Sequence, residues 1–164
     1  MLSPYKFITQ KQQGETHSEE DLRAFINGYI ANEIPDYQMS AWLMAVYFQG
    51  MTPDETAMMT QTMLESGRRL VIPPSAHPTG DKHSTGGIGD KITLILAPIL
   101  AVRGISVPTI TGRGLGFTGG TLDKLESIPG FSPDLSIEQL TSLVSRHGLA
   151  FGAQTREIVP ADRR

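Results

Sequence analysis

The sequence predicts a two-part protein of the α + α/β class, in which an all-helical lobe precedes a glycine-rich α/β lobe. Over residues 1–67, apolar residues recur at helical spacing behind repeated N-cap motifs. Residues 68–80 contain three prolines, which is typical of an extended connector between the two lobes. Residues 81–164 alternate glycine-rich loops with apolar segments of helix or strand length, which favours an α/β lobe.

The expected helices of the first lobe begin at recognisable caps. Ser3 precedes a proline, Ser18 opens an acidic capping box, and Thr52 opens a full capping box with Glu55. Asp36 is expected to cap the helix between them. The inner face of that helix is expected to consist of Met39, Trp42, Leu43, Val46 and Tyr47. The excess of apolar residues in so small a lobe predicts that part of its surface meets a partner.

In the second lobe, apolar segments of two lengths follow one another. A helix is expected over residues 92–102, with Pro98 inside it, and a strand over 105–110. A short helix over 122–126 and a longer helix opening at Ser136 should come next. Residues 149–153 are typical of a buried strand.

Two glycine-rich stretches, Asp81–Asp90 and Thr111–Glu126, carry the residues most suited to a functional site. Glycine permits positive φ angles and close approach of a ligand to backbone N–H groups, which can form a concavity for an anion. The first stretch runs into the expected helix at residue 92, whose free N–H groups and dipole would face the loop. Both stretches also hold a cation and hydroxyl side chains: Lys82, Ser84 and Thr85 in the first, and Thr111, Arg113 and Thr121 in the second. Thr93 adds a hydroxyl shortly after the first stretch. This inventory predicts a site for phosphate or another small oxyanion.

Two other interpretations compete with an anion site. Glycine-rich turns between strands and helices often make tight connections and nothing more. Gly114, Gly116 and Gly119 also fit the G-x-G-x-x-G fingerprint of dinucleotide-binding proteins. The context opposes the fingerprint, because the following segment is short, stops at Pro129-Gly130, and leads to no strand that ends in an acid.

Composition excludes several classes of protein. The net charge of −3 argues against a broad basic surface, so we expect no nucleic-acid partner. The absence of cysteine excludes disulfides and thiolate metal sites. No apolar run approaches the ~20 residues that span a bilayer, and the N-terminus lacks the apolar region of a signal peptide. We therefore expect a cytoplasmic protein without a membrane partner.

The two stretches resemble the signatures of the pyrimidine and thymidine phosphorylase family. Residues 111–126 match S-G-R-G-L-x-x-T-G-G-T-x-D-K-L-E, with Thr111 in place of the serine, and residues 81–90 match D-K-H-S-T-G-G-x-G-D. Further similar segments are 34–40, 47–52, 126–131 and 160–162. Family members are more than twice this length, so the resemblance implies an N-terminal portion with a helical lobe, a hinge and the start of a larger, truncated phosphate-binding lobe.

The resemblance also implies a reaction and roles for individual residues. Inorganic phosphate would cleave a pyrimidine nucleoside to a free base and a sugar 1-phosphate, without cofactor or metal. His83 would be a candidate for proton transfer to the leaving base, with a purely structural role as the alternative. The residues implied to bind phosphate are Lys82, Ser84, Thr93, Thr111 and Thr121. Those implied to brace the second loop through ion pairs are Arg113, Asp123, Lys124 and Glu126. Phe117 stands where many members have histidine, and Ala153 where glycine is usual.

The resemblance further implies a homodimer formed through the helical lobe. The arginine, serine and lysine that read the base in the family are expected beyond residue 164, so we expect this chain to be inactive alone. Two alternatives stay open: a related phosphoribosyltransferase, and a non-enzymatic dimerisation module. The sequence leaves the choice between thymidine and uridine open.

Overall fold

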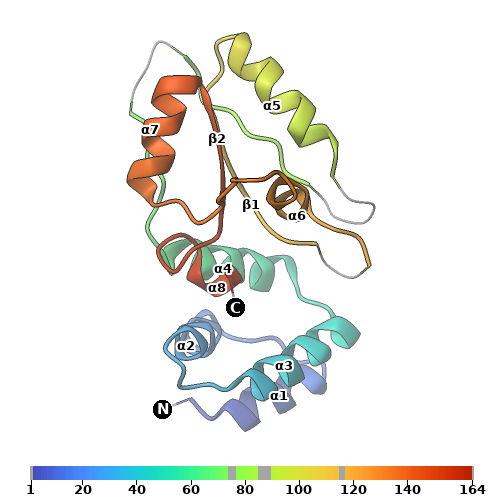
Figure 1. Ribbon diagram of the computed structural model, residues 1–164. Coiled ribbons are helices and arrows are strands. Elements are labelled where there is room, and N and C mark those ends of the chain that lie inside the picture. The colour runs from blue at the N-terminus through green and yellow to red at the C-terminus, as the bar shows by residue number, and fades with distance from the viewer. Residues whose placement is uncertain (1, 74–76, 85–89, 115–116, 164) are drawn as a thin grey trace. The chain divides into compact units, whose positions relative to one another are not determined.

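The computed structural model describes residues 2–73, 77–84, 90–114 and 117–163 (Figure 1). The chain forms two compact units. The first comprises Met1–Arg68 and Val159–Arg164, and the second comprises Arg69–Ile158. The order of a helical domain followed by an α/β domain is the predicted fold class.

The first unit consists of helices. They are α1 (Pro4–Gln12), α2 (Glu19–Ile30), α3 (Asp36–Gln49), α4 (Pro53–Glu65) and the short α8 (Pro160–Arg163). α1 packs against α3, α2 packs against α4, and α8 contacts both α2 and α4. The core is aromatic and aliphatic, with Phe7, Leu22, Phe25 and Trp42 fully or almost fully buried. Burial of such side chains is the main contribution to the stability of the unit.

The caps that open these helices agree with the sequence, with one exception. The side-chain oxygen of Ser18 accepts the N–H of Asp21, and Thr52 and Glu55 form both arms of a capping box. The prediction for Asp36 was wrong, because Asp36 is the first residue of α3 and Pro35 occupies the N-cap position.

The apolar face predicted for α3 was also wrong in part. Met39 and Trp42 are buried, but Leu43 and Tyr47 are exposed. Met44 and Phe48 are exposed as well, so α3 is apolar on its outer side too. The apolar residues of α3 therefore form two faces, and only one of them lies in the core of the unit.

The second unit is a small α/β arrangement. Its elements are α5 (Ile92–Val102), β1 (Val107–Thr111), α6 (Thr121–Glu126), α7 (Ile137–His147) and β2 (Leu149–Ala153). The predicted helices and strands are all present, and Pro98 lies inside α5 as expected. α7 begins at the capping box of Ser136 and Gln139 and ends at Gly148, whose φ of 76° is left-handed.

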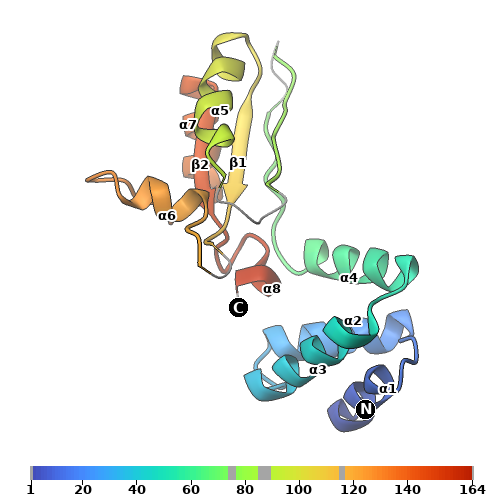
Figure 2. The same ribbon diagram turned by 90° about the vertical axis from the view of Figure 1, so that its right-hand side faces the viewer.

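The strands β1 and β2 pair in parallel, in the register Val107↔Leu149 to Thr111↔Ala153. α5 and α7 cover opposite faces of this pair (Figures 1 and 2). Thr79 forms a parallel bridge with Ser106, where the N–H of Gly80 donates to the carbonyl of Ser106. The end of the expected connector therefore lies along the free side of β1.

Across the described part of the chain, no helix combines the length and apolarity needed to cross a membrane.

Candidate anion-binding site

The predicted phosphate ligands lie in the α/β unit around the carboxyl end of β1. Lys82 follows the segment that pairs with Ser106, Thr111 is the last residue of β1, and Thr121 is the first residue of α6. Thr93 lies in the first turn of α5. The carboxyl ends of parallel strands are where open α/β sheets bind ligands.

The carboxylate of Asp90 connects three of these residues. The ammonium of Lys82 lies 2.9 Å from Oδ1 of Asp90. The hydroxyl of Thr121 donates to Oδ2 over 3.2 Å, and the hydroxyl of Thr93 donates to the same oxygen. Thr93 and Thr121 are themselves buried. Residues that are 8 positions before and 31 positions after Asp90 in the sequence thus meet at one carboxylate.

Asp90 is ionised in this environment. Its side chain is only 5% exposed, and burial alone would raise its pKa. Hydrogen bonds from Thr93 and Lys82 outweigh burial and hold the pKa well below its ordinary value. Sequence analysis gave Asp90 no role. One signal in the sequence could have indicated its role: Asp90 lies just before the expected helix, and an acid at a helix start commonly accepts backbone N–H groups.

The same carboxylate changes the prediction for the start of α5. The N–H groups of Ile92 and Thr93 donate to Oδ1 of Asp90, at 3.1 and 3.3 Å. These first donors of the helix were expected to be available to an anion in the glycine loop. They are already satisfied by a carboxylate of the chain itself. The rest of the expected loop, residues 85–89, lies outside the described residues.

The second loop is held together by Asp123. One of its carboxylate oxygens, Oδ2, accepts the N–H of Gly114 at 2.8 Å and that of Gly120 at 2.7 Å. These backbone bonds, followed by the ion pair with Arg113, lower the pKa of Asp123. Arg113 also binds Glu126, with a distance of 2.7 Å from Nη2 to Oε1. Three of the four charged residues predicted to brace this loop, Arg113, Asp123 and Glu126, are therefore joined by ion pairs.

Lys124 departs from the predicted ion pairing. Its ammonium donates to the carbonyls of Gly119 and Gly120, at 2.7 and 3.0 Å. It holds the loop through the backbone rather than through a carboxylate. The effect on the loop is the same, because the two carbonyls precede α6 directly.

Two described glycines of this loop, Gly114 and Gly120, are required by close packing rather than by positive φ. A Cβ on Gly114 would lie 2.0 Å from the carbonyl oxygen of Thr118, and one on Gly120 would lie 2.6 Å from the nitrogen of Gly114. Neither residue has a positive φ angle. Residues 112–114 and 118–120 therefore run against each other backbone to backbone.

The remaining predicted residues have less defined surroundings. His83 is exposed and Ser84 is half-buried. Phe117, which replaces the usual histidine, is 98% exposed, whereas Ala153 is buried at the end of β2. Gly116 lies outside the described residues. The dinucleotide fingerprint that includes it is disfavoured, since α6 spans only six residues and begins after Gly120.

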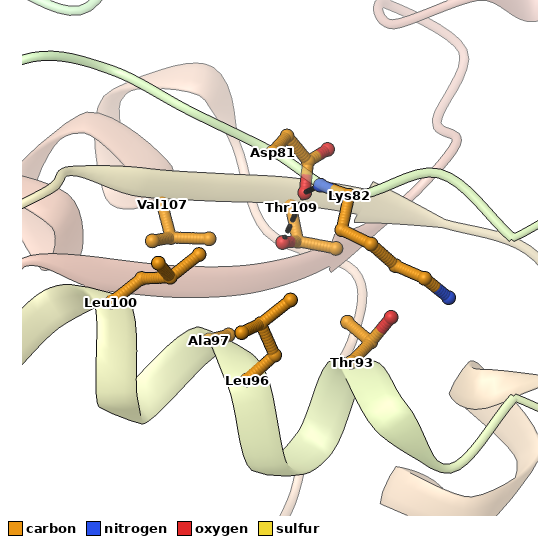
Figure 3. Close-up of a pocket in the computed structure, with 8 residues that line it drawn as sticks. All are labelled: Asp81, Lys82, Thr93, Leu96, Ala97, Leu100, Val107 and Thr109. Carbon is orange, nitrogen blue, oxygen red and sulfur yellow. Dashed lines mark hydrogen bonds between the residues drawn. The ribbon is translucent and has the colours of Figure 1, made fainter.

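A narrow pocket adjoins the Lys82 end of the site (Figure 3). Thr109 donates to Oδ1 of Asp81 over 2.8 Å, and the backbone N–H of Lys82 donates to the same oxygen. The side chains of Lys82 and Thr93 lie together at one end of the pocket, and Leu100 and Val107 lie at the other (Figure 3). Asp81 thus ties the segment that carries Lys82 to the middle of β1.

Two family models match the chain over almost its whole length. The helical bundle domain of a glycosyl transferase family matches residues 5–67, and the a/b domain of that family matches residues 76–164. The chain belongs to this glycosyl transferase family. The two matched domains correspond to the order of units seen in the fold.

Individual members of the glycosyl transferase family are similar to the chain at high identity. The pyrimidine-nucleoside phosphorylase of Geobacillus stearothermophilus is 43% identical over 157 residues, and the thymidine phosphorylase of Rattus norvegicus is 48% identical over 158 residues. Each alignment covers 96% of this chain but only 36% and 33% of the respective relative. The resemblance read from the two motifs is thereby confirmed, and the chain spans about a third of the length of these relatives.

A solved structure shows the same fold. Anthranilate phosphoribosyltransferase from Thermus thermophilus superposes with a TM-score of 0.70, over 95% of this chain and 47% of that one. Its sequence identity to the chain is 22%, so this likeness concerns the fold alone.

Proposed function

We propose that this chain supplies the phosphate-binding part of a pyrimidine-nucleoside phosphorylase. The observation that carries the proposal is the meeting of Lys82, Thr93 and Thr121 at one point beside the carboxyl end of β1. The family resemblance implies that these three residues bind phosphate, independently of the structure. In this proposal Ser84 and Thr111 complete the set, and Arg113, Asp123, Lys124 and Glu126 keep the second loop in shape.

The proposed reaction breaks the bond between the sugar and the base. An oxygen of inorganic phosphate bonds to the anomeric carbon, and the bonding electrons of the carbon–nitrogen bond leave with the base. Lys82 holds the phosphate by a charge-assisted contact, and the hydroxyls fix its orientation. His83 is the proposed proton donor to the departing base, because an exposed imidazole beside Lys82 can exchange protons with solvent and substrate.

The substrate class and the partners follow from the same proposal. The relatives are named pyrimidine-nucleoside and thymidine phosphorylase, so we take a pyrimidine nucleoside and inorganic phosphate as the substrates. A phosphoribosyltransferase shares the fold, but the match of residues 111–126 to the phosphorylase signature favours phosphorolysis. We further propose that these 164 residues bind phosphate without cleaving a nucleoside, because phosphate binding alone does not stabilise the leaving base.

We also propose a homodimer formed through the helical unit. The outer side of α3 exposes Leu43, Met44, Tyr47 and Phe48, and Tyr5 of α1 is exposed as well. α1 packs against α3. Large apolar side chains that stay exposed on a packed helix are typical of a protein–protein interface.

The phosphate proposal predicts the effect of removing Lys82. Inorganic phosphate should bind the Lys82→Met variant about ten- to a hundredfold more weakly, since a hydrogen bond to a charged group contributes roughly 1.5–3 kcal/mol. Isothermal titration calorimetry with the purified protein measures both affinities. Lys91→Met is the control, because it removes the same charge from an exposed side chain at the start of α5. Equal losses in the two variants would contradict a specific role for Lys82.

A further inference from the structure

Within the described residues, the carboxylate of Asp90 is contacted by five donor groups. Oδ1 receives the ammonium of Lys82 and the backbone N–H groups of Ile92 and Thr93. Oδ2 receives the hydroxyls of Thr93 and Thr121. Two carboxylate oxygens offer about four lone-pair sites, so this group is fully occupied. An anion of the chain itself thus sits among residues that the proposed function assigns to phosphate.

The hydroxyl groups cannot serve two anions at once. Threonine carries a single hydroxyl proton, and in the structure the hydroxyls of Thr93 and Thr121 donate to Asp90. A phosphate oxygen placed against these hydroxyls would face lone pairs until the protons turned toward it. Lys82 differs, because an ammonium has three N–H donors and can be shared between two acceptors.

We propose that Asp90 is an internal competitor of phosphate, which holds Lys82, Thr93 and Thr121 together before phosphate arrives and weakens phosphate binding there. This inference rests on the proposed function. Phosphate binding turns the two hydroxyl protons from Asp90 to the ligand and leaves Lys82 bonded to both anions. Asp90 keeps the N–H groups of Ile92 and Thr93, so α5 stays capped. No proton changes its parent atom in this exchange.

The electrostatic consequence has a definite sign. The side chain of Asp90 is only 5% exposed, its carboxyl group is ionised, and it lies within hydrogen-bond reach of three proposed phosphate ligands. A negative charge at that position repels an incoming anion and neutralises Lys82, and screening by solvent is reduced at a buried site. If Asp90 only positioned the phosphate ligands, its presence would strengthen phosphate binding or leave it unchanged. Asp90 is expected to oppose it.

The Asp90→Asn variant tests the inference. Asparagine has the same shape, and its amide oxygen can still accept the N–H groups of Ile92 and Thr93. Inorganic phosphate should bind this variant about tenfold more tightly than the wild type, because Lys82 and both hydroxyls are released. Asp134→Asn is the matched control. It makes the same change at an exposed aspartate of the α/β unit, and it should change the affinity much less.

The outcomes separate this inference from the proposed function. If the wild type binds phosphate and Asp90→Asn binds it equally or more weakly, the competitor role is wrong while the phosphate site stands. If neither protein binds phosphate, the site itself is wrong and the inference falls with it. Should Asp90→Asn fail to fold, carbon-13 NMR of the wild type decides. During a titration with inorganic phosphate, the chemical shift of the Asp90 carboxyl carbon should change, and the affinity obtained from that change should equal the affinity from calorimetry. A chemical shift that does not change overturns the proposal.

Discussion

His17 occupies an unusual position among the side chains of the helical unit. It is 5% exposed, and its ring stacks on that of Phe7 with the centroids 3.6 Å apart. The indole N–H of Trp42 donates to Nε2 of His17 over 3.1 Å, so a neutral ring carries its proton on Nδ1. Within the described residues, Nδ1 has no hydrogen-bond partner. A positive charge on this ring would be buried against aromatic neighbours.

Glu55 and Lys11 form a buried ion pair next to His17. Their charged atoms lie 2.7 Å apart, and Glu55 also accepts the backbone N–H of His17. Burial of Glu55 would raise its pKa, but hydrogen bonds from Lys11 and the backbone of His17 and Thr52 outweigh it and lower the pKa to about 2. Glu55 therefore stays ionised through the acidic range in which His17 takes up a proton.

These contacts predict an acid-sensitive helical unit. Burial, followed by the charge of Lys11, lowers the pKa of His17 to about 4 from 6.5. Between those values the unfolded chain binds a proton that the folded chain does not, so the free energy of unfolding should fall as the pH drops from about 6.5 to 4. The expected loss is on the order of 3 kcal/mol, since one pKa unit corresponds to about 1.4 kcal/mol.

Urea unfolding at several pH values, followed by the fluorescence of Trp42, measures this dependence. His17→Gln is the informative variant, because its side-chain oxygen can still accept the Trp42 N–H without titrating. The slope between pH 6.5 and 4 should be reduced in the variant. An unchanged slope would show that another group is responsible.

At the scale of single elements, the loop before α6 depends on Gly114 and Gly120. Gly120→Ala should disrupt it, because the new Cβ would lie 2.6 Å from backbone atoms of Arg113 and Gly114. Gly119→Ala is a suitable control, since its Cβ would meet the Cβ of Asp123 at an ordinary 3.4 Å. Overpacking of this kind typically costs about 1–3 kcal/mol.

Thermal unfolding and phosphate titration of the two glycine variants provide the measurement. Gly120→Ala should lower the melting temperature and weaken phosphate binding through Thr121, the residue that follows it. Gly119→Ala should resemble the wild type in both. Equal behaviour of the two variants would mean that the backbone contact between residues 112–114 and 118–120 is not required.

Local signals predicted the elements well. The capping boxes at Thr52 and Ser136 are formed as the sequence indicated, since a cap depends only on residues three apart. The strands and helices of the second unit were found because apolar runs and glycine stops are also local. Periodicity failed on α3, where Leu43 and Tyr47 share the helical spacing of core residues but are exposed. Helical spacing alone does not distinguish an apolar face that packs in the core from one that stays on the surface of the unit.

Long-range contacts were the part that the sequence did not reveal. The role of Asp90 depends on Lys82 and Thr121, which only the folded chain brings together. Glu55 was predicted as a cap, but its ion pair with Lys11 joins residues 44 positions apart. The glycines of the second loop were identified, yet the reason for them is a backbone contact and not a turn. The motif resemblance indicated which residues form the proposed site, whereas the contacts among their charges came from the structure.

At the scale of the whole molecule, the exposed aromatic residues of the helical unit require an explanation. Tyr47 and Phe48 are 78% and 74% exposed, and their rings meet edge to face with the centroids 5.3 Å apart. Burying such side chains contributes about 1.5–3 kcal/mol for each large apolar residue. A second copy of the chain offers the same apolar surface, and a two-fold contact between identical surfaces is the commonest closed arrangement.

We therefore expect the protein to be a dimer at micromolar concentration and the double variant Tyr47→Lys, Phe48→Lys to be a monomer. Lysine at both positions places like charges opposite one another across a two-fold interface, which opposes association. Both side chains are exposed, so the helices should stay folded, as circular dichroism can verify. Phe117→Lys is the control, because it adds charge at an exposed aromatic residue of the other unit. Sedimentation velocity distinguishes the species. A monomeric wild type, or a dimeric double variant, would show that this surface does not join two copies of the chain.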